Sequence, residues 1–247
     1  VGDEFSRENL YSIVASYGTV SCLKFLFDKT SEITYFKFNK WKNLLKLKIG
    51  DSQNSMLGWA IILNPRIESI IYLWNFYVGK FSNLDMLSFL CVKNAKAIDF
   101  FGLAVRYLQS REIFIAIWEE IKILLKTERS FKKFLHLKGF KLLGVSIYAE
   151  NENVFYFLFE EVFCKLLSNK ELIFGDNENG ENCCQLLVEL GSFAMNQFAF
   201  NHLEKRLERD DIKTLLKIKN NKEMNLLHFA ARKNNSDEAI NLILKFF

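Results

Sequence analysis

Proline is nearly absent from this sequence. Pro65 is the only proline among 247 residues. Because proline breaks the interior of a helix, its scarcity allows long and uninterrupted helices. The same scarcity argues against an all-β chain or a linker-rich chain, since both depend on proline-containing turns. We therefore expect a helical protein.

Histidine is also scarce, and motifs for catalysis are missing. None of His136, His202 and His228 has a partner at metal-ligand spacing, and no Cys-x-x-Cys, His-Glu-x-x-His or Gly-x-Ser-x-Gly motif occurs. No glycine-rich loop could cradle a phosphate. The adjacent thiols of Cys183 and Cys184 are better interpreted as core residues than as nucleophiles, and His228 as a structural hydrogen-bonding residue. We predict no catalytic residue, no metal site, no cofactor and no enzymatic activity.

Long apolar runs and paired cysteines are missing as well. The apolar runs, such as Ala60–Leu63 and Ile70–Trp74, stop well short of the roughly 20 residues that a membrane span needs. The five cysteines are scattered and odd in number, which indicates reduced thiols. We therefore expect a cytoplasmic protein with no spanning helix. If the protein is a secreted effector of an intracellular microbe, that cytoplasm is the host's.

The chain does contain many apolar residues and unevenly placed charge. Half of its residues are apolar and 25 are phenylalanine, enough for a substantial core. The net charge of +4 is too small to imply nucleic acid by itself. Five lysines fall between Lys37 and Lys48 with no acid among them, whereas residues 150–189 hold nine acids and two lysines. With aromatic residues interleaved, the lysine segment resembles a nucleic-acid or anionic-membrane patch. A lysine-edged amphipathic helix explains it more simply.

The clearest motif lies near the end of the chain, in Asn225–Ala231. Its pair of alanines predicts a thin helix that a neighbour can approach closely. Leu227 and the apolar residues of 240–243 would then bury one face of a helix pair. Related helix pairs are expected upstream at residues 9–27, 50–76 and 139–159.

This motif resembles the Thr-Pro-Leu-His-x-Ala-Ala core of an ankyrin repeat, a helix-turn-helix unit of about 33 residues. Asn220–Glu223 stand where the family has its Asp-x-x-Gly turn, so the resemblance implies a turn there. Asn225 and Leu226 replace the threonine and the proline of the family, so the copy is degenerate. The resemblance implies an all-α, ankyrin-like helical-repeat solenoid of about six irregular helix pairs, forming a single domain over residues 1–247. Helices inserted at 30–48 and 111–136 would account for the uneven spacing, although the second of these could equally be a repeat.

The uneven spacing leads to further expectations. Residues 85–94 and 97–108 are expected to form one helix pair, and the outer helix near 198–216 is expected to be extended. Asn179 and Gly180 predict a tight turn. Because the phenylalanines at the end of the chain would leave apolar surface on a terminal repeat, we expect the chain to be part of a longer protein.

Ankyrin repeats bind partners through their turn tips and the solvent-facing side of their inner helices. The resemblance therefore implies a protein–protein interaction module, and a surface changing from basic near Lys138 to acidic near Glu181 would steer a charged partner. Two alternatives stay open: a recruiting or regulatory region of a larger effector enzyme, and a helical solenoid that binds nucleic acid through the lysine segment. The residues carried onto the expected surface are Asn221, Lys222, Met224, Arg232 and Lys233 in the last copy, Glu178, Asn179, Glu181 and Glu189 in the copy before it, and Phe140 with Tyr148 in an earlier one.

Overall fold

The computed structural model describes residues 10–32, 38–108, 110–125, 142–165, 168–174, 179–232 and 236–245. Within these ranges every regular element is a helix and no strand is present, so the all-α prediction is confirmed. The helices fall into two compact units. Unit 1 holds α1 to α8, and unit 2 holds the helical residues 142–148 and α10 to α16. That the whole chain acts as a single domain stays a prediction.

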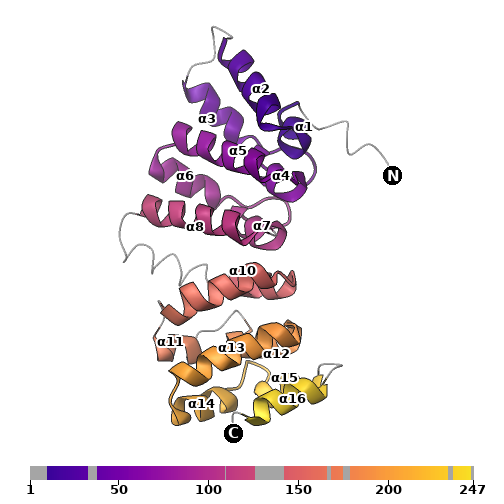
Figure 1. Ribbon diagram of the computed structural model, residues 1–247, viewed down its shortest axis with the longest axis vertical. Helices are drawn as coiled ribbons and strands as arrows, with labels where there is room; N and C mark the ends of the chain where they lie inside the picture. Colours follow the sequence, from indigo (N-terminus) through magenta and orange to yellow (C-terminus); the bar gives the residue numbers. More distant parts are fainter. Residues whose placement is uncertain are drawn as a thin grey trace, which may run out of the picture. The chain divides into compact units, whose positions relative to one another are not determined.

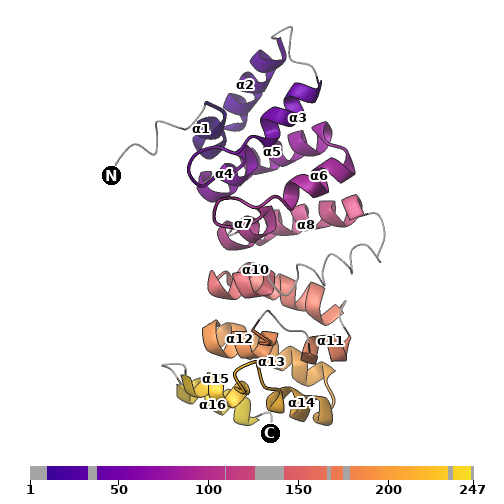
Figure 2. The ribbon, with the colours of Figure 1, turned by 180° about the vertical axis from the view of Figure 1, so that it is seen from behind.

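Unit 1 is a stack of short helices in three parallel columns (Figures 1 and 2). The inner helices α1, α4 and α7 pack on one another in that order, and α2 and α3 both pack on α5. The short helices α3 and α6 lie on the opposite side of the unit from the inner helices. The bounds are α1 Leu10–Tyr17, α2 Val20–Glu32, α3 Phe38–Lys46, α4 Met56–Leu63, α5 Ile67–Lys80, α6 Asn83–Leu90, α7 Phe100–Tyr107 and α8 Arg111–Leu125.

Unit 2 repeats this arrangement. Its inner helices are residues 142–148, α12 and α15, and α12 packs on α15. The outer helices α10, α13 and α16 pack in succession, and α11 packs on α14. The bounds are α10 Glu152–Phe157, which continues as the π-helical segment η2 Leu158–Cys164, then α11 Asn169–Phe174, α12 Cys183–Leu190, α13 Phe193–Arg206, α14 Arg209–Lys217, α15 Leu226–Arg232 and α16 Ser236–Lys245.

The repeat is longer than the sequence suggested. The inner helices begin at residues 10, 56, 100, 142, 183 and 226, so successive starts are 46, 44, 42, 41 and 43 residues apart. The described residues contain six helix pairs, in agreement with the expected number of about six, but their period exceeds the roughly 33 residues of an ankyrin repeat. The extra length is a short third helix: α3, α6, α11 or α14. The helix expected within 30–48 is therefore present as α3, but as a regular part of the repeat.

Two expected boundaries were wrong. Residues 85–90 belong to α6, the third helix of the second repeat, residues 91–94 are not helical, and α7 instead begins the next repeat, with α8 as its outer helix. The extended helix near 198–216 is two helices, because Leu207 and Glu208 take extended backbone conformations between α13 and α14. This break lets Leu207 turn into the core, where only 6% of it is exposed.

The last helix pair buries a slightly different face from the one expected. Leu226, Phe229 and Ala230 are each fully buried, whereas Leu227 is half-buried. On α16, Leu242 and Ile243 are buried as expected. The close helix contact predicted from the alanine pair is made by Ala230, and Ala231 faces solvent.

Side-chain caps fix where the helices begin. In each case a serine, aspartate or asparagine accepts a hydrogen bond from the backbone N–H three residues later, which satisfies a donor that has no partner inside the helix. These caps precede both inner and outer helices, so they stabilise the turns between successive helices of the repeat. The capping residues are Ser55, Ser82, Asp99, Asn151, Asn182 and Ser192.

Candidate functional site

An asparagine builds the turn that leads into an inner helix, and it does so in the same way in both units. In unit 2, Oδ1 of Asn220 accepts hydrogen bonds from the backbone N–H groups of Lys222 and Met224, both at 2.9 Å. In unit 1, Oδ1 of Asn94 accepts the two equivalent bonds, both at 3.0 Å. The fourth residue of each turn has a positive φ, of 59° at Glu223 and 57° at Ala97. The turn predicted at 220–223 is therefore confirmed.

Neighbouring turns are hydrogen-bonded to each other. The backbone N–H of Asn221 donates to the carbonyl oxygen of Asn179 at 3.1 Å. Between them, Gly180 has a φ of 70°, and a Cβ there would lie 2.5 Å from Oδ1 of Asn221. Only glycine fits this conformation and this close approach. The turns therefore present the exposed residues Asn179, Asn221 and Lys222 side by side.

The inner helices of unit 2 present a second group of the expected residues. Tyr148, Glu189 and Arg232 each occupy the seventh position of their inner helix. Nη2 of Arg232 lies 2.8 Å from Oε1 of Glu189, and Nη1 of Arg232 lies 3.8 Å from Sδ of Met224. Tyr148 is 76% exposed. Successive repeats thus display a phenol, a carboxylate and a guanidinium at one position.

Part of the expected surface falls outside the described residues. Phe140, Glu178 and Lys233 lie there, as does Lys138 at the basic end of the expected charge gradient. Glu181 is half-buried, with Oε2 at 3.4 Å from Nδ2 of Asn179. The structure therefore brings together two groups of expected residues, the turn tips and the Glu189, Met224 and Arg232 cluster.

Cysteine and histidine side chains, which are catalytic or metal-binding in many proteins, have structural partners in this protein at Cys183, Cys184 and His228. A hydrogen bond from the Cys183 thiol to Cys184, together with burial, raises the pKa of Cys183 well above its usual value, so the thiol stays protonated. Cys184 is 1% exposed, as expected of a core residue. Nδ1 of His228 lies 2.5 Å from Oδ1 of Asn225, at the start of α15. In the described ranges no three His, Cys, Asp or Glu side chains lie close enough to hold a metal ion.

The lysine segment forms the amphipathic helix α3. Trp41 is only 4% exposed because it packs edge-on against Phe27 and Phe76. Its ring is therefore not available to stack on a base, although such stacking is how single strands are commonly held. Nζ of Lys42 lies 2.6 Å from Asp85, and Lys46 approaches the same carboxylate at 3.7 Å. The side chains of Phe36, Lys37, Phe38 and Lys40 are not among those described.

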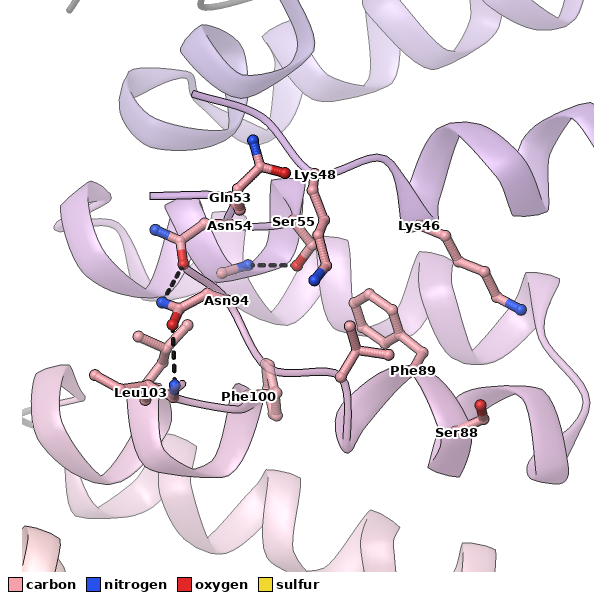
Figure 3. A pocket seen from close by; sticks show the side chains of 13 residues that line it. Lys46, Lys48, Gln53, Asn54, Ser55, Ser88, Phe89, Asn94, Phe100 and Leu103 are labelled. Carbon is pink, nitrogen blue, oxygen red and sulfur yellow. Dashed lines mark hydrogen bonds between the residues drawn. The ribbon is translucent and has the colours of Figure 1, made fainter. Parts of the chain in front are cut away.

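Unit 1 also contains a pocket that the sequence did not reveal (Figure 3). Its volume is about 110 Å³, and it opens to solvent beside α3. Nδ2 of Asn94 donates to Oδ1 of Asn54 at 2.8 Å along one wall. Val92 is 47% exposed at the mouth, whereas Phe89 and Phe100 are almost fully buried. The lining residues are Lys46, Lys48, Gln53, Asn54, Ser55, Gly58, Ser88, Phe89, Val92, Asn94, Ile98, Phe100 and Leu103.

Taken together, the columns of helices and the recurring turns define a helical-repeat protein. No family model and no curated protein matches the chain. Among solved structures, it is similar to a chain from the complex of Bd0816, a predatory endopeptidase from Bdellovibrio bacteriovorus, with the immunity protein Bd3460. The two chains share 17% identity at a TM-score of 0.55, over 97% of this chain and 98% of that chain. At this identity the likeness supports the fold alone.

In the part of the chain that the structure describes, no helix is both long and apolar enough to cross a membrane.

Proposed function

We propose that the protein is a non-enzymatic protein-binding module that docks its partner on the turn tips and inner helices of unit 2. The observation that carries the proposal is the series Tyr148, Glu189 and Arg232, which varies in chemistry at one position of successive repeats; this position is exposed at Tyr148 and Arg232 and half-buried at Glu189. By contrast, the first residue of each of these inner helices, Leu142, Cys183 or Leu226, is buried. In a repeat protein, buried residues at the same position keep neighbouring repeats packed on each other. Surface residues that differ from repeat to repeat allow the protein to recognise a particular partner.

We also propose that the repeats are a lengthened form of the ankyrin repeat. Three observations support this: the asparagine-built turn before the inner helix, the hydrogen bond between neighbouring turns, and the hydrogen bond from the backbone N–H of Asn225 to Nδ1 of His228 at the Thr-Pro-Leu-His position. The third helices α3, α6, α11 and α14 account for the added length of the repeats that contain them. The five cysteines are all free, which supports a reducing compartment such as the cytoplasm. The solved neighbour comes from a two-protein complex, which supports a protein partner.

The test begins with capture of a partner by the full chain from cells that express it, followed by mass spectrometry. The affinity of the purified partner is then measured for a charge swap, Glu189→Arg with Arg232→Glu. The swap keeps an ion pair at this place but reverses the charges that the partner meets. If the pair contacts the partner, we expect the swap to weaken binding by about tenfold or more, as expected for charged groups inside an interface.

Two controls make the result specific. Lys205→Glu changes an exposed charge on the outer helix α13 of the same unit and should leave the affinity unchanged. Lys222→Glu with Arg232→Glu should weaken binding and reduce its dependence on salt, because both side chains lie on the expected surface. Retention of full affinity by the swap and by this double variant would contradict the placement of the docking surface.

A further inference from the structure

The pocket in unit 1 lies where unit 2 contains a glutamine side chain. Gly58 is the third residue of α4, and Gln185 is the third residue of α12. Gln185 is fully buried, and its Oε1 accepts a hydrogen bond from the backbone N–H of the capping residue Asn182 at 2.9 Å. Its Nε2 donates to the carbonyl oxygens of Ile218 and Met224, at 3.1 and 3.2 Å. This one amide group therefore ties a helix to the next turn.

The backbone around the pocket in unit 1 is arranged like the backbone around Gln185 in unit 2, but Gly58 has no side chain equivalent to that of Gln185 to occupy the space. Because Asn94 and Asn220 build equivalent turns, Val92 and Ile98 correspond to Ile218 and Met224, two residues before and four after the asparagine. Ser55 corresponds to Asn182, since each caps its inner helix. Ser55, Val92 and Ile98 all line the pocket. Glycine at position 58 leaves the space between them open.

The size of the pocket suits one side chain. Its volume is about 110 Å³, whereas a cavity that admits benzene has about 150 Å³. Small-molecule and cofactor sites begin at about 300 Å³. The occupant is therefore a single side chain from a larger molecule.

The charge around the mouth selects an acidic partner. Residues 38–107 contain nine Lys or Arg and four acids. Of those acids, Asp99 is buried as a helix cap, and Asp85 is already held by Lys42. At the mouth, Lys48 donates to the carbonyl oxygen of Lys93 at 2.6 Å, which leaves its positive charge in place.

The apolar wall favours a peptide over a nucleic acid. Phe89 and Phe100 are 6% and 4% exposed, so neither offers a ring face on which a base could stack. Leu103 is 5% exposed and completes a wall suited to the methylene groups of a side chain.

We propose that this pocket binds a glutamine side chain from an acidic segment of a partner protein, with its amide bonded as that of Gln185 is in unit 2. Lys46 and Lys48 at the mouth then attract the acids on either side of the glutamine. The proposal concerns unit 1 alone and does not depend on the docking surface proposed for unit 2.

The test uses a fluorescein-labelled nonapeptide with one central glutamine between two groups of four alternating Asp and Glu residues, titrated against the full chain. The first control peptide replaces the glutamine by methionine, which has a similar length and lacks the amide. We expect this change to weaken binding by about tenfold, because the amide hydrogen bonds are lost. Equal binding of the two peptides would overturn the proposal.

Protein variants test the same pocket from the other side. Gly58→Gln should fill the pocket with its own amide and abolish peptide binding while the melting temperature is kept or raised. Ser88→Tyr and Val92→Trp, at exposed positions of the rim, should block the mouth even if Gly58→Gln perturbs the fold. Peptide binding unchanged in all folded members of this set would overturn the proposal.

Charge variants separate the pocket from a diffuse basic surface. Lys46→Glu with Lys48→Glu should weaken peptide binding by about tenfold and flatten its salt dependence. Lys24→Glu with Lys29→Glu makes the same change in net charge on α2 and should alter binding less than twofold. A single-stranded oligonucleotide of equal charge serves as competitor. If it displaces the peptide and depends on Lys46 and Lys48 in the same way, the site is a nucleic-acid site and the proposal is wrong.

Discussion

The inner helices α4 and α7 of unit 1 differ from α12 and α15 of unit 2 in how they close the junction between a turn and the inner helix that follows it. The third residue of the inner helix is Gly58 in α4 and Gly102 in α7, but Gln185 in α12 and His228 in α15. In α12 and α15 this side chain folds back and accepts a hydrogen bond from the backbone N–H of the residue before the helix, at 2.9 and 3.2 Å. In α4 and α7 a glycine leaves the junction to be closed by other side chains, and the helical residues 142–148 of unit 2 have Gly144 at the same position.

The two glycines show that an open junction is not a uniform feature of unit 1. A Cβ on Gly102 would lie 2.8 Å from Cγ2 of Ile98, so that junction is already filled. A Cβ on Gly58 would meet its nearest atom, Cδ1 of Leu103, at 3.3 Å, which a small movement of the leucine relieves. The same backbone arrangement therefore gives either a filled junction or a pocket, depending on the side chains that surround the third residue of the inner helix. Such variation at constant backbone is what repeat proteins use to diversify their surfaces.

The largest expected effect comes from breaking the helix contact beside the sealed junction of unit 2. Ala230 is fully buried, so Ala230→Glu places a charge in a close contact between helices. We expect the free energy of unfolding to fall by about 3 kcal/mol or more, from overpacking and the burial of a charge. Ala231→Glu is the matched control, because Ala231 is exposed on the same helix and should tolerate the change. Urea denaturation measures both, and equal midpoints for the two variants would refute the assignment of the contact.

Opening the sealed junction should have the next largest effect. Gln185→Gly removes an amide that makes three hydrogen bonds and leaves buried carbonyl groups behind. We expect a loss of about 2 kcal/mol beyond the cost of glycine in a helix. Gln197→Gly, at an exposed position of α13, measures that helix cost alone. If the two variants unfold at the same urea concentration, the amide of Gln185 does not hold the turn.

Closing the pocket of unit 1 should stabilise the chain. Gly58→Gln removes a flexible glycine from a helix and creates a capping box with Ser55, which together contribute about 1 kcal/mol. Gly102→Gln is the opposing control, since its Cβ has no room, and it should destabilise the fold. A fall in melting temperature for both variants would show that the space beside Gly58 cannot accept the side chain.

Much of the fold could be predicted from the sequence because the helices are defined by local signals. The helix pairs expected within 9–27 and 50–76 and the turn at Asn220 all lie where the residues indicated them. The third helix of the repeat was missed because α6 has the same apolar spacing as an inner helix. Its role depends on contact with α5, which local periodicity does not encode.

Some residues of the candidate sites could likewise be predicted from local sequence, whereas others depend on packing between distant segments. Asn179 and Asn221 could be assigned to turn tips, because turn chemistry is local. The pairing of Glu189 with Arg232 required the packing of two inner helices 43 residues apart. The pocket could not be predicted, because it depends on a bond from Asn94 to Asn54, 40 residues away, and on the space left by Gly58.

The smallest expected effect lies at the ion pair that joins α3 to α6 beside the pocket. Hydrogen bonds from Lys42 and Ser82 lower the pKa of the Asp85 carboxyl from 3.8 to about 2. Because the pKa is lower in the folded chain, this interaction stabilises the fold in full above about pH 4, and its contribution is lost as the pH falls through about 2. Asp85→Asn should therefore lower the urea midpoint slightly at pH 6, and the difference from the unaltered protein should close as the pH approaches 2. If the difference in urea midpoint stays constant over this range, the carboxylate charge does not hold α3 in place. Another interaction would then have to position the lysines at the mouth of the pocket.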